Sequence, residues 1–426
     1  MEHLLFATYL ILFAWLVTKL KFFKNSGLTS TQLIILFLVK VMAGIFYGWI
    51  GVYYGQLAQM VDTWAFHYSS VREYQLLIHS PHDFFATIFQ NNYEHGYGGF
   101  LSSTNSWWND LHSNLFIKML AVFNVLSFEN YYINVIFYSF ITMFGPVAIY
   151  KIMLDVFPHK PLEVLIASFL IPSFIYWTSG IHKDGLIFLG FILIIYNVYF
   201  GLKNKHLSFR SWIAMLLGLL IIIGFRNYLL LLIIPALIAW IISEKVKTKP
   251  LLVYITVYLL FAICFFTLRY ISPKLDFPNS VVEKQQEFLK LKGDSFVLIK
   301  QLQSSFLSFV VNAPQALNLT VIRPYPSDVH HLLSLAAAVE INLLLILFIV
   351  FLFWRTNVVS LTPFILFCLF FSFSGFLTIG YTVNFLGAIV RYRSIFFPFI
   401  IIPMIAKINW DKIRGLVLGN IKNKNN

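Results

Sequence analysis

Residues 332–354 read LLSLAAAVEINLLLILFIVFLFW, a run in which Glu340 is the only charged side chain. A helix needs about 20 mainly apolar residues to cross the hydrocarbon layer of a bilayer, so this run predicts a membrane span. Comparable runs recur from one end of the chain to the other, and they predict about eleven spans in all. The other predicted spans are 3–20, 30–55, 131–154, 161–178, 184–202, 209–225, 227–243, 250–270, 357–379 and 394–408.

The composition agrees with a membrane protein. Of the 426 residues, 59% are hydrophobic and 12% are charged, whereas soluble domains are about half apolar and about a quarter charged. Cys264 and Cys368 both lie in apolar runs, which gives no sign of a disulfide framework. We therefore expect an all-α, polytopic transmembrane helix bundle, with residues 1–426 forming a single transmembrane domain.

The charges alternate from loop to loop. The net charge is +13, and the basic residues concentrate in alternate loops, at 19–24, 203–210, 245–249 and 407–424. The positive-inside rule places these loops in the cytoplasm. The chain is then predicted to lie in the inner (cytoplasmic) membrane of a cell, with its N-terminus outside and its C-terminus in the cytoplasm. Topology accounts for the positive charge, so we expect no nucleic-acid partner.

Two long segments, 56–130 and 271–331, are then external and should carry the function. The first begins VDTWAFHY at residues 61–68, which places Asp62 at the membrane surface beside the second span. A carboxylate at that depth can reach both a lipid-borne phosphate and a soluble hydroxyl, so Asp62 is a candidate base, with a solvated interfacial acid as the alternative. Segments 70–90 and 114–128 have the pattern of helices lying on the membrane surface.

The same external segment is rich in aromatic and polar side chains. Such a mixture suits sugar binding, although aromatic belts occur at every membrane interface. The candidates for substrate contact here are Tyr68, Glu94, His95, Trp108 and Asp110. No cofactor is certain. A divalent metal is possible in principle, because Glu94, His95, Asp110 and His112 are suitable ligand types, but their spacing fits no metal motif.

Several cations stand outside against the charge rule. The turn IPSFIYWTSGIHKDG at 171–185 carries His182, Lys183 and Asp184, and VRYR at 390–393 carries Arg391 and Arg393. Arg226 and the RPYPSD segment at 323–328, with Arg323 and Asp328, add two more external arginines. The arginine fork matches phosphate oxygens. A phosphate ligand and ordinary lipid headgroups are therefore the competing interpretations.

Lys40 and Glu340 are the ionisable residues inside predicted spans. Charges are costly there unless they are paired or face a cavity. The two residues could pair with each other, and Lys40 could instead extend its side chain to the interface.

This order of features resembles the GT-C superfamily of integral membrane glycosyltransferases, which use polyprenyl-phosphate-linked sugars. The resemblance rests on the acid after a span, the turn at 171–185, and the Arg391-Tyr392-Arg393 segment before the last span. It implies that Asp62 is the base or acceptor-orienting group of an inverting transfer. The leaving phosphate would be bound by Lys183, His182, Arg391, Arg393 and Arg226.

The resemblance also implies partners and further site residues. The partners would be a polyprenyl-phosphate-linked sugar, a glycan or lipid-linked acceptor and membrane lipids. Acceptor contacts would come from Tyr68, Glu94, His95, Trp108, Asp110, Asp184, Arg323 and Asp328.

Two other functions fit the same topology. A polymerase or ligase of lipid-linked polysaccharides would need external arginines but no early carboxylate, so Asp62→Ala discriminates. A non-enzymatic glycan-lipid transporter would place polar residues along the interior of the spans, whereas here only Lys40 and Glu340 interrupt them.

Overall fold

The computed structural model describes residues 2–53, 58–89, 100–101, 107–356 and 361–415. In these residues the secondary structure is helical, apart from two isolated β-bridges. Eight apolar stretches are long enough to cross a membrane, and the number rises to ten if two bent helix pairs each count as one span. The predicted all-α membrane architecture is confirmed at this level.

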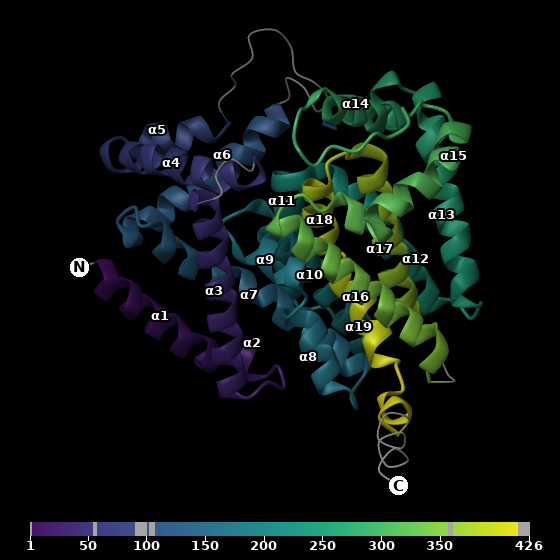
Figure 1. Cartoon of the computed structure of the whole chain (residues 1–426), viewed down its shortest axis with the longest axis horizontal. Coiled ribbons are helices and arrows are strands. Elements are labelled where there is room, and N and C mark those ends of the chain that lie inside the picture. Colours follow the sequence, from purple (N-terminus) through teal and green to yellow (C-terminus); the bar gives the residue numbers. More distant parts are fainter. Residues whose placement is uncertain (1, 54–57, 90–99, 102–106, 357–360, 416–426) are drawn as a thin grey trace.

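The long apolar helices run roughly side by side and form the body of the molecule (Figure 1). Their bounds are α1 Glu2–Lys19, α3 Ser30–Tyr53, α7 Tyr131–Val156, α10 Lys183–Asn204, α11 Phe209–Arg226, α12 Leu230–Lys245, α13 Pro250–Thr267, α16 Leu332–Trp354 and α17 Pro363–Thr382. Short helical pieces join some of them, namely α2 Lys21–Lys24, η2 Asn227–Leu229 and η3 Leu268–Tyr270.

Two apolar stretches consist of bent helix pairs, and a proline begins the second helix of the first pair. Residues 161–178 form α8 Pro161–Phe169 and α9 Pro172–Ser179, which meet at 50°. The second pair is α18 Leu386–Ser394 and α19 Phe397–Ala406, bent by 64°. The residue before a proline disfavours the helical conformation, and Ile171, before Pro172, is extended. The stretch predicted as an external turn at 380–393 therefore contains a helix, and the last straight helix is shorter than predicted.

The stretch from Phe209 to Lys245 reverses its direction at η2. Arg226 contacts Asp184 at the start of α10, whereas Trp240 packs on Tyr199 near the end of α10. α11 therefore ends near the start of α10, and α12 leads back toward the end of α10. The two helices α11 and α12 thus run in opposite directions. The turn at η2 thereby brings Arg226 to the same end of the bundle as residues 182–184.

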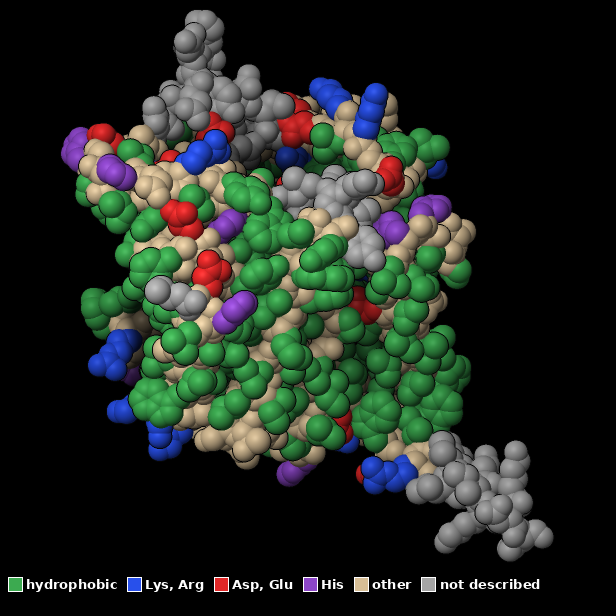
Figure 2. All heavy atoms as spheres, turned by 60° about the vertical axis from the view of Figure 1, so that its left-hand side comes forward, with side chains coloured by type: hydrophobic (Ala, Val, Ile, Leu, Met, Phe, Trp, Pro, Cys, Tyr) green, Lys and Arg blue, Asp and Glu red, His purple; other side chains and the backbone are tan. Residues whose placement is uncertain are grey.

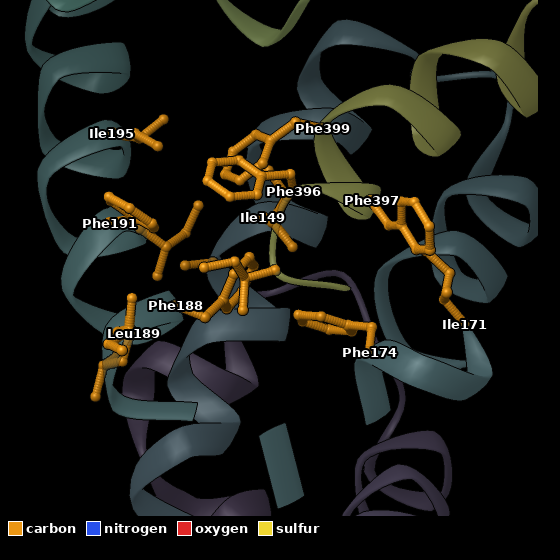
Figure 3. Close-up of a cluster of buried hydrophobic side chains, with 14 of the residues drawn as sticks. Ile149, Ile171, Phe174, Phe188, Leu189, Phe191, Ile195, Phe396, Phe397 and Phe399 are labelled. Atoms are coloured by element: carbon orange, nitrogen blue, oxygen red, sulfur yellow. The ribbon is translucent and has the colours of Figure 1, made fainter. Parts of the chain in front are cut away.

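The core lies where α7, α9, α10 and α19 meet. Figure 3 shows Phe174, Phe188, Phe191 and Phe399 among the aliphatic side chains of this cluster. In the most apolar 18-residue stretch of α7, 78% of the residues are buried, whereas the corresponding share is 17% in α13 and in α16. The helices α7, α9 and α10 are therefore the interior of the bundle, while α13 and α16 present most of their surface outward.

Helices of the two long segments predicted to be external, 56–130 and 271–331, cover one end of the bundle (Figure 1). Figure 2 shows a broad apolar belt around the middle of the visible face, with most charged side chains toward its upper and lower edges. The bounds of these elements are α4 Ala58–His79, α5 Pro81–Ala86, η1 Thr87–Phe89, α6 Trp107–Ser127, η4 Pro273–Leu275, α14 Phe277–Lys290, α15 Phe306–Leu317, η5 Asn318–Ile322 and η6 Pro326–Asp328. The two segments predicted as surface helices, 70–90 and 114–128, are helical, but the helices begin earlier in the chain than expected, so Asp62 lies on a helix.

Candidate functional site

The site is built around the turn that joins α9 to α10. His182 is the N-cap of α10, and its Nδ1 accepts a hydrogen bond of 2.8 Å from the Lys183 backbone N–H. The carbonyl of Ile181 accepts from the Thr63 hydroxyl at 3.0 Å, and the carbonyl of His182 accepts from the Tyr138 hydroxyl. Neighbouring helices thus fix the backbone that presents residues 182–184.

Tight packing holds the same turn from the side. A Cβ atom on Gly180 would lie 2.3 Å from the Tyr47 ring, and one on Gly44 would lie 2.6 Å from the Ser179 carbonyl oxygen. Both positions therefore require glycine for close approach of α3 to α9.

Asp184 is the centre of a buried ion network. Its side chain is fully buried; Oδ2 lies 2.7 Å from Nε of Arg391, and Oδ1 lies 2.8 Å from Nη2 of Arg226. The network joins α10, α11 and α18, which are distant in sequence. Because a buried carboxylate is stable only when paired, Asp184 fixes the positions of both arginines and does not face a substrate itself.

His182 links this network to Asp62. Its Nδ1 receives the Lys183 N–H and lies 2.7 Å from Arg391 Nη2. Nε2 lies 2.6 Å from the same Nη2 atom, and Nδ1 also lies 3.1 Å from Oδ2 of Asp184. Nε2 lies 3.6 Å from Oδ2 of Asp62, so the ring bridges the Asp184–Arg391 pair and the Asp62 carboxylate.

Asp62 is the exposed edge of the cluster. Its side chain is 52% exposed, and Oδ2 lies 3.7 Å from Nη1 of Arg391. Partial burial raises the pKa of Asp62, but the hydrogen bond from His182 and the charges of Arg391 and Lys183 outweigh burial and hold the pKa below its usual value. Asp62 is therefore a carboxylate at neutral pH.

Lys183 lies on the α6 side of the cluster. Its Nζ is 3.2 Å from the Ser113 hydroxyl and 5.1 Å from the centroid of the Phe66 ring. Among the described residues it makes no ion pair within 4.0 Å. With three cations against two carboxylates, the cluster has an excess positive charge that can attract an anion.

Next to Lys183, His112 is buried on α6. Burial is the main cause that lowers the pKa of His112, to about 4, with Lys183 and Arg226 adding to it. His112 is thus neutral at physiological pH, and its Nε2 has no hydrogen-bond partner among the described residues.

The structure places the other predicted site residues outside the cluster. Arg393 is fully buried and donates from Nη1 to the carbonyls of Thr320, at 2.9 Å, and Arg323, at 2.5 Å. Arg323 itself forms a bidentate pair with Asp328, at 2.9 and 3.0 Å. Arg393 therefore anchors the segment 271–331, and the Arg323–Asp328 pair stabilises the turn within that segment.

The aromatic candidates are also separate from the cluster. Tyr68 is exposed beside Trp64, and Trp108 packs against Phe100. Asp110 lies in the first turn of α6. Glu94 and His95 lie outside the described residues.

No group of three His, Cys, Asp or Glu side chains in the described part of the chain is arranged to hold a metal ion. In the cluster, the Arg391 guanidinium lies between the carboxylates of Asp62 and Asp184 and the His182 ring, within 3.7 Å of all three. A cation of the protein thus fills the position that a metal would need.

Sequence reasoning missed the residues that support the turn. Thr63, Tyr138 and Tyr47 contact it from three different helices. Lys40 is the exception, because a charged residue within a predicted span is a signal that the sequence does give, and its side chain contacts this turn. Its Nζ donates to the Thr178 carbonyl at 2.9 Å and lies 3.3 Å from the Ser179 hydroxyl.

Lys40 and Glu340 do not pair with each other. Oε1 of Glu340 accepts a hydrogen bond of 2.9 Å from the Ser173 backbone N–H, at the start of α9, whereas Lys40 binds the other end. The two buried charges thus bracket α9 with the signs that favour its dipole.

Comparisons with known proteins give no relatives: no family model, curated protein or solved structure matches the chain.

Proposed function

We propose that this chain is a membrane glycosyltransferase of the GT-C type, which moves a sugar from a polyprenyl-phosphate donor to a lipid-linked or cell-envelope acceptor. One observation supports it most: the half-exposed Asp62 carboxylate borders a buried cluster with net positive charge. A base next to a phosphate-binding group is the combination that transfer from a sugar phosphate needs.

The proposed reaction uses the two sides of the cluster. The acceptor oxygen forms a bond to the anomeric carbon, the bond from that carbon to the phosphate oxygen breaks, and the configuration inverts. Asp62 takes the proton of the acceptor hydroxyl. The leaving phosphate keeps the electron pair, and its new charge is stabilised by Lys183, Arg391 and Arg226.

His182 has a positioning role in this scheme. It contacts Asp62, Asp184 and Arg391, so it holds the base and the phosphate-binding arginine at a fixed separation. The low pKa of Asp62 makes it a weak base while the site is empty. An incoming phosphate would offset the nearby positive charge and raise that pKa toward the range of a working base.

The proposal includes a topology. If the stretch from Phe209 to Lys245 crosses twice and each bent pair crosses once, the chain has about eleven spans. The positive-inside rule then places the cluster and both long segments outside, in the cytoplasmic membrane of a cell, with the C-terminus inside.

The test is transfer from radiolabelled polyprenyl-phosphate sugars by purified protein in lipid. We expect Asp62→Ala and Arg391→Ala each to reduce kcat by a factor of at least 100, whereas Asp83→Ala, at an exposed external acid, should leave kcat unchanged. If the wild type consumes no donor but polymerises a lipid-linked oligosaccharide, and Asp62→Ala has no effect, the polymerase alternative replaces this proposal.

A further inference from the structure

An apolar groove opens between α3, α9, α16 and α18. It has a volume of about 350 Å³, and its walls include Phe46, Tyr176, Trp177, Ala337 and Val390. α3 and α16 are candidate membrane spans, and α9 and α18 belong to the bent pairs. The groove therefore lies against the hydrocarbon part of the membrane.

A second pocket, of about 540 Å³ and with a mixed lining of charged and apolar side chains, adjoins the groove. The two cavities share part of their lining, namely Asp294, Ser295, Asp328, His330 and Leu386. These residues come from the second external segment and the start of α18. Groove and pocket thus adjoin through shared residues, with an apolar lining at one end and charged side chains among apolar ones at the other, and this combination suits an amphiphile.

The physical setting of the groove selects a lipid chain. Its surface offers water few polar partners, and water is scarce at the level of the spans, so a hydrocarbon chain is the stable filling. α16 is largely outward-facing, and a chain can enter from the bilayer beside it.

The charges of the pocket select the headgroup. Arg323 is engaged in its pair with Asp328, and Asp294 makes no ion pair within the described part of the chain. The pocket therefore has excess negative charge, which repels a phosphate. Carboxylates accept hydrogen bonds from hydroxyl groups, so an uncharged polyhydroxylated headgroup fits best.

We infer that the groove and pocket bind a lipid-linked saccharide as the acceptor, with the lipid chain in the groove and the sugar in the pocket. The role of this bound lipid as the acceptor rests on the proposed transferase function. The Trp177 ring, which lines the groove, lies 5.5 Å from the Arg391 guanidinium. The acceptor would thus approach the cluster from the Trp177 side, with its hydroxyl directed to Asp62, and the phosphate of the donor would lie on the Lys183 side.

Binding can be measured without turnover. The protein in nanodiscs is titrated with a tritiated phytanyl lactoside, and free lactose and phytanyl phosphate serve as competitors. We expect Ala337→Trp, which fills the groove, to raise the Kd for the lactoside at least tenfold. Val339→Trp is the matched control, because Val339 is exposed on the same helix and does not line the groove; its Kd should equal that of the wild type.

Asp294→Asn tests the headgroup. It should raise the Kd for phytanyl lactoside about tenfold, and phytanyl phosphate should compete weakly in every variant. The inference is overturned if phytanyl phosphate competes as well as the lactoside, or if Val339→Trp and Ala337→Trp act alike. Asp62→Ala should abolish transfer and leave lactoside binding intact, so a failure of the transferase proposal is distinguishable from a failure of this site.

Discussion

At the scale of single residues, Asp184 is a fully buried carboxylate that is stabilised by its two arginine partners. It balances two arginines from helices that are distant in sequence. Removing one partner of a buried ion network is costly because the others lose their compensation.

We therefore expect Asp184→Asn to lower the free energy of unfolding by about 3–5 kcal/mol. Asp155→Asn is the control, because Asp155 pairs with the exposed Lys203, and exposed pairs contribute about 1 kcal/mol or less. Denaturant unfolding in detergent micelles measures both variants. Equal losses in the two would show that the Asp184 network is not a special source of stability.

Asp62 yields a prediction about pH. Its folded-state pKa is below the ordinary value of 3.8, so its ion pairs contribute stability above that value and lose it as the pH falls through the folded-state pKa. The difference in thermal midpoint between wild type and Asp62→Asn should stay constant from pH 8 to pH 5 and shrink only below about pH 4. A difference that already shrinks between pH 7 and pH 5 would mean that the pKa of Asp62 is raised.

At the scale of elements, α9 is a short helix whose two ends are held by buried charges from α3 and α16. Glu340 binds the N–H of Ser173, and Lys40 binds the carbonyl of Thr178. The C-terminal end of α9 leads directly into the turn with His182, so the charges that stabilise this helix also position the site.

We expect Lys40→Met to increase amide hydrogen exchange at residues 178–182 at least tenfold and to lower transfer activity. Lys40→Arg, which keeps the charge, should restore part of the protection. Glu340→Gln should affect the amide of Ser173 first, since its hydrogen bond is at the opposite end. Exchange that rises uniformly along α9 in both variants would contradict the separate roles of the two charges.

At the scale of the whole molecule, the apolar runs were sufficient to predict the helix bundle, because twenty apolar residues have few other stable arrangements. The break before Pro172 and the break between Ser394 and Phe397 were not predicted, because hydropathy is continuous across them. Asp62, His182, Lys183, Arg226 and Arg391 were identified as separate external features. Their meeting at Asp184 depends on packing between helices, which no local pattern encodes, and Arg393 could not be told from Arg391 by its sequence neighbours.

The proposed topology makes the final prediction. His206 is exposed between α10 and α11, and Lys274 is exposed beyond α13; the charge rule places them on opposite sides of the membrane. In a Cys264→Ala background, Lys274→Cys should react with a membrane-impermeant maleimide in intact cells. His206→Cys should react only after permeabilisation, and Cys368, which is buried, should stay unlabelled in both. Labelling of both introduced cysteines in intact cells, or of His206→Cys alone, would refute the topology and with it the external location of the cluster.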